Sequence, residues 1–171
     1  MEIYVVRHTH VAVPSGVCYG RAEVPLAETF EAEAGETVRR LPDGIESVFT
    51  SPAERCRRLA EKISAKYFVS DSLQEMNFGE WEKCRWDDLP RSEVDAWCEN
   101  FVDVAPPGGE NLRQMYSRVS AFMDSLEKSN YQRVLIVTHA GVIRCINARK
   151  NNLELKDLFS FNAEYGKMYI F

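Results

Sequence analysis

Short runs of apolar residues recur along the chain and predict the strands of a sheet. Residues 2–6 read EIYVV, residues 47–50 read SVFT and residues 134–138 read VLIVT. Because these runs are continuous and do not alternate with polar residues, they are typical of strands buried on both faces, as in a parallel sheet. The last residues, 168–171, are expected to form a closing strand.

Segments between these runs carry apolar residues every three or four positions, which predicts helices. The spacing indicates helices over about 26–41, from 51 onward, after 109, and from 141 to about 150. In the second helix, Ser51 is expected to be the N-cap, with Pro52 in the first turn and Glu54 completing a capping box. The expected core-facing residues of the first three helices are Leu26, Phe30, Ala34, Val38 and Leu41; Cys56, Leu59, Ala60, Ile63 and Tyr67; and Leu112, Met115, Val119, Phe122 and Leu126.

Strands that alternate with helices predict a single three-layer α/β domain, in which helices cover both faces of a mainly parallel sheet. The 171 residues suit one domain, which is expected to span 1–171. Residues 72–109 are the least regular part and hold all three tryptophans and a Pro-Pro-Gly-Gly run. We expect this segment to be an insert that shapes a site, with a plain surface subdomain as the alternative.

Composition and charge exclude several classes of protein. A hydrophobic content of 45% supports a continuous core, and no apolar run approaches the roughly 20 residues that cross a bilayer. The net charge of −5 counts against a nucleic-acid partner. The five cysteines form no C-x-x-C pair, so neither a zinc site nor a redox motif is predicted. We therefore expect a soluble, cytoplasmic protein without membrane or nucleic-acid partners; the sequence leaves its oligomeric state open.

Basic and imidazole side chains follow three of the predicted strands. Arg7 and His8 come directly after the first strand, and Arg55 lies in the first turns of the helix after the second. His139 follows the third strand at the start of another helix. Ligands of open α/β sheets bind outside the carboxyl ends of the strands, so we expect these side chains to meet at one edge. Guanidinium groups and helix N-termini together bind a tetrahedral dianion such as phosphate.

Two imidazoles in an anion pocket are compatible with metal binding or with nucleophilic catalysis. A metal would need a third ligand, which His10 or a carboxylate would have to supply, and the nearby arginines disfavour a divalent cation. A neutral imidazole can instead attack phosphorus and form a phosphohistidine that water hydrolyses, while the arginines neutralise the phosphoryl oxygens. We therefore expect no metal and no cofactor.

Five motifs resemble, in order, those of the histidine phosphatase superfamily, also called phosphoglycerate-mutase-like, over nearly the whole chain. Arg7-His8-Thr9 matches R-H-[GT], and the run CYGRAEVPL at 18–26 looks like the substrate loop of the family. SPAERC at 51–56 resembles S-P-x-x-R-[AC], and LQEMNFGEWE at 73–82 is similar to L-x-E-x-x-F-G-x-W-E. VTHAG at 137–141 resembles V-[ST]-H-x-G, and PGGE at 107–110 matches a recurrent turn. The resemblance implies a phosphoglycerate-mutase-like fold.

The resemblance also implies a role for each matched residue. His8 would be the nucleophile that becomes phosphorylated, and Glu75 would donate a proton to the leaving oxygen. His139 would be the second phosphate-binding histidine. The implied catalytic set is His8, Glu75, Arg7, Arg55 and His139, and the implied substrate-binding set is Thr9, Tyr19, Gly20 and Ala140.

The sequence departs from the family pattern at two positions near the first motif. His10 stands where many members carry Glu or Gln. Some members place an Asn near the phosphate shortly after this motif, but Pro14 or Ser15 falls there in this chain.

Taken together, the resemblance implies a metal-independent phosphomonoester hydrolase with a small-molecule substrate. Phosphoglycerate mutases of the family are typically longer, which favours hydrolysis over transfer here. The chain looks most similar to small bacterial α-ribazole phosphatases of cobalamin biosynthesis, on the loop at 16–20 and on Trp81 and Trp97. These two rings are expected either to stack on a dimethylbenzimidazole or to lie in the core. The alternatives are a broad or sugar-phosphate phosphatase, a phosphoglycerate mutase and, least favoured, a non-catalytic module that binds phospho-ligands.

Overall fold

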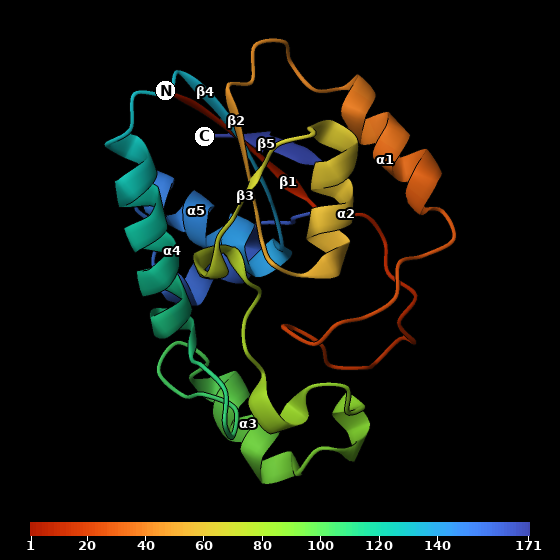
Figure 1. Ribbon diagram of the computed structural model, residues 1–171. Helices are drawn as coiled ribbons and strands as arrows, with labels where there is room; N and C mark the ends of the chain where they lie inside the picture. Colours follow the sequence, from red (N-terminus) through yellow and green to blue (C-terminus); the bar gives the residue numbers. More distant parts are fainter.

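A five-stranded sheet lies at the centre of the computed structural model, which describes residues 1–171 (Figure 1). The strand order is β3-β2-β4-β1-β5. The first four strands run parallel, and β5 pairs antiparallel with β1. The strands are β1 (Glu2–Arg7), β2 (Ser47–Thr50), β3 (Phe68–Val69), β4 (Arg133–Thr138) and β5 (Met168–Ile170).

Helices cover both faces of this sheet, as the sequence predicts (Figure 1). On one face lie α1 (Phe30–Arg39) and α2 (Glu54–Ile63), and on the other lie α4 (Leu112–Glu127) and α5 (Ala140–Asn151). Successive strand side chains point to opposite faces, so each central strand contributes to two cores. Tyr4 and Val6 join the core under α1 and α2, whereas Ile3 and Val5 join the core under α4 and α5.

The first helix is shorter than its apolar spacing predicts. It begins at Phe30, and Leu26 lies before it, paired with Val11 in an isolated bridge. Val38, expected in the core, is 37% exposed, while Thr37 is buried and donates a hydrogen bond to the Gly166 carbonyl. The spacing rule misses this because a threonine can be buried when its hydroxyl has an acceptor.

The predicted N-cap of the second helix is wrong. This helix, α2, begins at Glu54, and Ala53 occupies the cap position without a side-chain cap. The carboxylate of Glu23 instead accepts a hydrogen bond from the Glu54 N–H at 3.1 Å. A residue 31 positions away therefore satisfies this helix end, and the Ser51 hydroxyl is used elsewhere. Tyr67 lies beyond the last residue of α2 and is not part of its apolar face.

Residues 72–109 hold more regular structure than expected, including α3 (Arg91–Glu99) and three short 3₁₀ turns at 71–73, 79–81 and 86–88. The aromatic rings of this segment pack on one another. Trp81 is 2% exposed, and its ring meets that of Trp97 edge to face at 5.9 Å. Of the two interpretations of this pair, the structure favours a core role. The segment lies below the sheet in Figure 1, beyond the carboxyl ends of the strands.

A further 3₁₀ turn, Leu155–Ser160, follows α5 and leads to the last strand. None of the helices combines the length and the apolar character needed to cross a membrane.

Candidate active site

Parallel pairing of β1 and β4 brings two histidines together at the edge of the sheet. The register pairs Arg7 with Thr138, so that the next residues, His8 and His139, leave the sheet side by side. The His8 N–H donates to the Thr138 carbonyl at 3.0 Å, which fixes this exit. The two rings are buried, with centroids 5.2 Å apart and planes at 66°.

The ring of His8 is held in one tautomer. Its Nδ1 lies 2.8 Å from the backbone carbonyl oxygen of Thr9. A carbonyl can only accept, so the proton of the neutral ring is on Nδ1 and Nε2 carries a free lone pair. Burial lowers the pKa of His8 well below its usual value, and the charges of Arg55 and Arg7 lower it further. His8 is therefore neutral at pH 7 and can act as a nucleophile.

The ring of His139 is oriented by groups on both nitrogens. Arg55 Nη2 lies 3.4 Å from Nδ1, and the Ser51 hydroxyl lies 2.8 Å from Nε2. A guanidinium can only donate, so Nδ1 accepts and the proton is on Nε2, which donates to Ser51. Burial is also the largest cause that lowers the pKa of His139, followed by repulsion between the two rings if His8 is protonated as well.

Two arginines lie beside the histidines, one fully buried and the other partly buried. Arg55 is fully buried at the start of α2 and donates to the carbonyl oxygens of Gly20 and Ala22. Arg7 donates to the Ala163 carbonyl at 2.7 Å, and its guanidinium carbon lies 3.5 Å from the ring centroid of Tyr165. The Nε–H groups of both arginines are buried without a partner in the chain, and an anion oxygen is a partner that such donors can accept.

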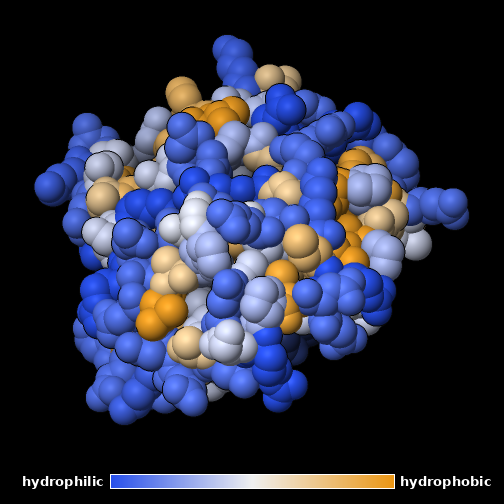
Figure 2. Space-filling model, turned by 90° about the horizontal axis from the view of Figure 1, so that it is seen from below, coloured by the Kyte–Doolittle hydropathy of each residue, from blue (hydrophilic) through white to orange (hydrophobic).

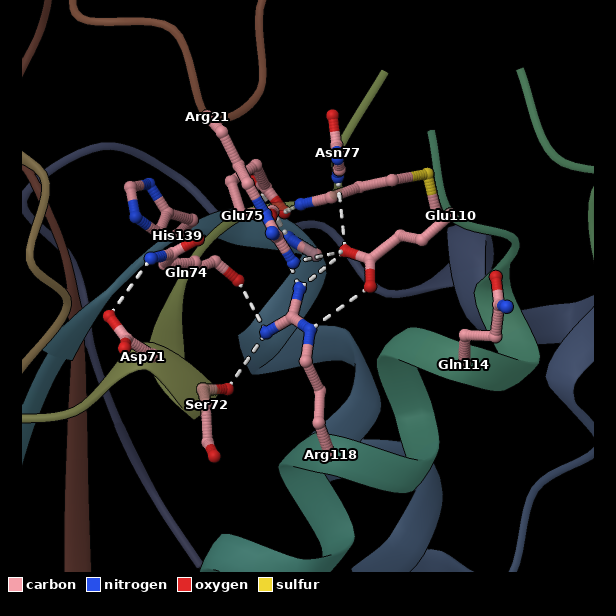
Figure 3. A network of polar contacts seen from close by, with 12 residues as sticks. Arg21, Asp71, Ser72, Gln74, Glu75, Asn77, Glu110, Gln114, Arg118 and His139 are labelled. Carbon is pink, nitrogen blue, oxygen red and sulfur yellow. Dashed lines mark hydrogen bonds and ion pairs between the residues drawn. The ribbon is translucent and has the colours of Figure 1, made fainter. Parts of the chain in front are cut away.

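Glu75 reaches the site from the segment after β3. One carboxylate oxygen accepts from the Met76 N–H at 2.9 Å, and the other accepts from the Gly141 N–H at 3.2 Å. Gly141 lies in the first turn of α5, two residues after His139, so the contact joins Glu75 to the N-terminus of that helix. Figure 3 shows Glu75 beside His139 and above a network of arginine contacts.

All five residues of the predicted catalytic set line one cavity of about 260 Å³. Tyr19 and Ala140, from the predicted substrate-binding set, line it as well. Thr9 and Gly20 do not: Thr9 is buried and its carbonyl accepts from His8, and Gly20 lines a neighbouring cavity while its carbonyl accepts from Arg55. Figure 2 views the molecule from below, where hydrophobic residues form separate patches in a largely hydrophilic surface.

Two residues of the site, Ser51 and Arg144, were not predicted as site residues from the sequence. Ser51 was predicted as an N-cap but contacts His139. Arg144 lies on α5 and lines the cavity; its Nε donates to the Phe161 carbonyl at 3.0 Å. Its position four residues after Ala140 was the only sequence signal, because residues three and four apart lie on one face of a helix.

A smaller apolar cavity of about 90 Å³ adjoins the first one and shares four lining residues with it. Phe159, which is half exposed, lies at this cavity, and the guanidinium carbon of Arg144 lies 5.3 Å from its ring centroid. Trp86 lines the larger cavity, whereas Trp81 and Trp97 line neither. The shared residues are Tyr19, Glu75, Phe78 and Arg144.

The arrangement has the components of a phosphoryl-transfer site. It presents a neutral imidazole nucleophile, two guanidinium groups, a second imidazole and a carboxyl group around one cavity. No group of three or more histidine, cysteine, aspartate or glutamate side chains is arranged to hold a metal ion.

Comparisons with known proteins agree with this geometry. The family model of the Histidine phosphatase superfamily (branch 1) matches residues 3–171. An adenosylcobalamin/alpha-ribazole phosphatase of Salmonella typhimurium is 30% identical, over 97% of this chain and 87% of its own length. Phosphoserine phosphatase 1 of Hydrogenobacter thermophilus is 23% identical, over 99% and 87% of the two chains. The crystal structure of the alpha-ribazole phosphatase from Shigella flexneri superposes with a TM-score of 0.92 at 27% identity, covering 99% of this chain and 89% of that one.

Proposed function

The chain belongs to the histidine phosphatase superfamily and is a phosphatase, and from this premise we propose that it hydrolyses α-ribazole 5′-phosphate through a phosphohistidine on His8. Two related proteins named as alpha-ribazole phosphatases, one of them a solved structure, support this substrate. The observation that carries the proposal is the apolar cavity beside the phosphate site, next to the half-exposed ring of Phe159. A flat benzimidazole is the kind of group that can stack on an exposed aromatic ring beside such a cavity.

In the first half-reaction, Nε2 of His8 attacks phosphorus as the bond from phosphorus to the ester oxygen breaks. Arg7 and Arg55 neutralise the phosphoryl oxygens, His139 lies beside them at the phosphoryl group, and the leaving alkoxide takes a proton from Glu75. The products of this step are α-ribazole and phosphohistidine.

In the second half-reaction, water attacks the phosphorus of the phosphohistidine. Glu75, now ionised, accepts a proton from this water, the bond between His8 and phosphorus breaks, and inorganic phosphate leaves. The arginines supply the positive charge that a metal ion supplies in many phosphoryl-transfer enzymes, so the proposed reaction needs no metal.

A second candidate is a phosphate ester whose leaving group carries a carboxylate, such as phosphoserine. The observation that favours it is Arg144, which lines the leaving-group side of the cavity with its Nη groups free of hydrogen bonds within the chain. A guanidinium binds a carboxylate strongly. The relative named phosphoserine phosphatase 1 agrees with this alternative.

The test is phosphate release with excess chelator, comparing α-ribazole 5′-phosphate, phosphoserine, 3-phosphoglycerate and fructose 2,6-bisphosphate. His8→Ala is the blank. A preference for α-ribazole 5′-phosphate of at least a hundredfold in kcat/KM supports the proposal, and a similar preference for phosphoserine supports the second candidate. Comparable, weak turnover of all four would contradict both.

Trapping the intermediate tests the mechanism apart from the substrate. Acid-labile label from ³²P-labelled substrate is expected on the wild-type chain after rapid denaturation in base, and none is expected on His8→Ala. Turnover without such a label, or activity lost to the chelator, would overturn the mechanism. Phosphate binding without turnover would identify a binding module.

A further inference from the structure

The PGGE turn at 107–110 brings a partly buried ion pair to the segment that carries Glu75. Glu110 contacts Arg118 of α4 through both carboxylate oxygens, at 2.6 and 3.1 Å. The two side chains are 12% and 18% exposed. Burial alone would raise the pKa of Glu110, but its hydrogen bonds and charge interaction with Arg118 lower it, so the carboxylate stays ionised.

The rest of the Arg118 guanidinium binds backbone carbonyl oxygens at Glu75 and just before it. Its Nη1 donates to the carbonyl oxygens of Ser72 and Gln74, both at 2.8 Å, and its Nη2 donates to that of Glu75 at 3.1 Å (Figure 3). With the two bonds to Glu110, all five N–H donors of the group are used. A lysine has three donors and no planar fork, so it cannot reproduce this set.

The same ion pair reaches the substrate loop. Arg21 donates to Glu110 at 3.2 Å and to the Glu75 carbonyl oxygen at 3.3 Å. Glu110 also accepts from the Asn77 N–H at 3.0 Å, two residues after the acid. The substrate loop at 18–26, the segment that carries Glu75, the PGGE turn and α4 therefore meet at the carboxylate of Glu110.

Backbone contacts hold the PGGE turn against the segment that follows Glu75. The Glu110 N–H donates to the Asn77 carbonyl at 2.9 Å, and the Glu80 N–H donates to that of Pro107 at 2.8 Å. A Cβ on Gly79, where φ is +55°, would lie 2.1 Å from the Pro107 oxygen. Glycine at this position thus permits the approach that delivers Glu110 to Arg118.

We propose that Arg118 and Glu110 are positioning residues for the proton transfer by Glu75, and that Arg21 links this pair to the substrate loop. The inference rests on the proposed role of Glu75 as the acid. The backbone of Glu75 is held by Arg118 and Arg21, and its carboxylate by the Gly141 N–H, so both ends of the residue are fixed. A small displacement of an acid lowers the rate of proton transfer without removing the phosphate-binding groups.

The experiment uses leaving groups that differ in their need for an acid. An alkyl phosphate requires protonation of its leaving oxygen, whereas p-nitrophenolate leaves without it. The quantity compared is kcat/KM, which covers the steps up to departure of the leaving group and excludes hydrolysis of the phosphohistidine. The variants are Glu75→Gln, Arg118→Lys, Arg21→Met and the control Arg113→Lys, an exposed arginine on α4.

We expect Arg118→Lys to lower kcat/KM for the alkyl phosphate about tenfold to a hundredfold, part of the loss that general acid catalysis covers, and to change that for p-nitrophenyl phosphate less than threefold. The Arg21 side chain is 35% exposed, and Arg21→Met is expected to show the same selectivity with a smaller loss. If Arg118→Lys does not fold, Arg21→Met still tests the proposal. Arg113→Lys is expected to change neither value.

Equal losses on both substrates, or no loss on the alkyl phosphate, would overturn the positioning role. The Glu75→Gln variant separates this failure from failure of the proposed mechanism. If Glu75→Gln lowers only the alkyl reaction and the arginine variants do not, the inference alone is wrong. If Glu75→Gln is also unselective, Glu75 is not the acid and the mechanism itself is wrong.

Discussion

The rings of His8 and His139 meet edge to face with their centroids 5.2 Å apart, deep in a site that also buries Arg55. Burial lowers the pKa of both histidines, and the charges of the arginines add to the effect. Each ring also opposes protonation of the other, because two imidazolium charges at this distance repel. The site thus keeps His8 neutral without a dedicated general base.

The first prediction concerns stability between pH 5 and 7. In the unfolded chain each histidine titrates near 6.5, so below that pH the unfolded state binds more protons than the folded state. The free energy of unfolding is therefore greatest above about pH 6.5 and falls as the pH decreases towards the lowered folded-state pKa values. Each histidine contributes up to about 1.4 kcal/mol per pH unit in this window. Urea unfolding at several pH values measures the slope.

One variant assigns this slope. His139→Gln is expected to remove about half of it, because one buried imidazole remains. The same slope in wild type and His139→Gln would contradict the assignment.

The second prediction concerns the Ser51 hydroxyl, which lies 2.8 Å from Nε2 of His139. Ser51→Ala leaves this buried N–H without its partner, at a cost of about 1–3 kcal/mol. We expect lower stability of that order and a fall in kcat/KM of about tenfold, since His139 loses its fixed orientation. Chemical denaturation and steady-state kinetics measure the two effects.

Ser120→Ala is the matched control. The Ser120 hydroxyl on α4 is buried and has no hydrogen-bond partner, so its removal breaks no contact. Stability and activity close to wild type are expected. If Ser51→Ala is as active and as stable as Ser120→Ala, the contact between Ser51 and His139 contributes to neither stability nor kcat/KM.

Ser51 also shows where the sequence stops being informative. Its position before Pro52 and Glu54 is typical of an N-cap, and local spacing alone favours that role. The register of β2 and β4, which pairs Thr50 with Val137, instead carries Ser51 to the ring of His139. Local rules contain no information on that long-range pairing.

The strands and the strand-end residues were predictable because each depends on a short local pattern. Buried apolar runs mark β1, β2 and β4, and Arg7, His8 and His139 follow them directly. The cavity therefore contains the five residues that the motifs indicate. Arg118 was not predictable in this way, because on α4 it has the spacing of a surface charge and its partners lie 8 to 46 residues away.

The third prediction compares two glycines in helices. A Cβ at position 141 would lie 2.2 Å from a carboxylate oxygen of Glu75 and 2.9 Å from the Met115 side chain. Gly141→Ala is therefore expected to displace the Glu75 carboxylate and to lower kcat/KM for an alkyl phosphate at least tenfold. The loss for p-nitrophenyl phosphate is expected to be smaller, because this ester needs no acid.

Gly35→Ala is the counterpart in α1, where an added Cβ meets nothing within 4 Å. Alanine is favoured over glycine in a helix interior by about 0.8–1.0 kcal/mol. We expect higher stability of about that size and unchanged activity. Gly141→Ala with full activity towards both esters would contradict the contact between Glu75 and the start of α5.

The last prediction separates the two candidate substrates by their leaving groups. Arg144 offers a charge to a carboxylate, and Phe159 offers a half-exposed ring to a base. Arg144→Met is expected to lower kcat/KM for phosphoserine more than tenfold, because a hydrogen bond to a charged group contributes about 1.5–3 kcal/mol. Phe159→Ala is expected to lower kcat/KM for α-ribazole 5′-phosphate about tenfold, within the range of about 1–3 kcal/mol for a base stacked on an aromatic ring. Each variant should affect the other substrate less than threefold, since the phosphate-binding residues are untouched. Equal effects of both variants on both substrates would mean that neither side chain contacts the leaving group. The apolar cavity would then give no support to a substrate that carries a benzimidazole.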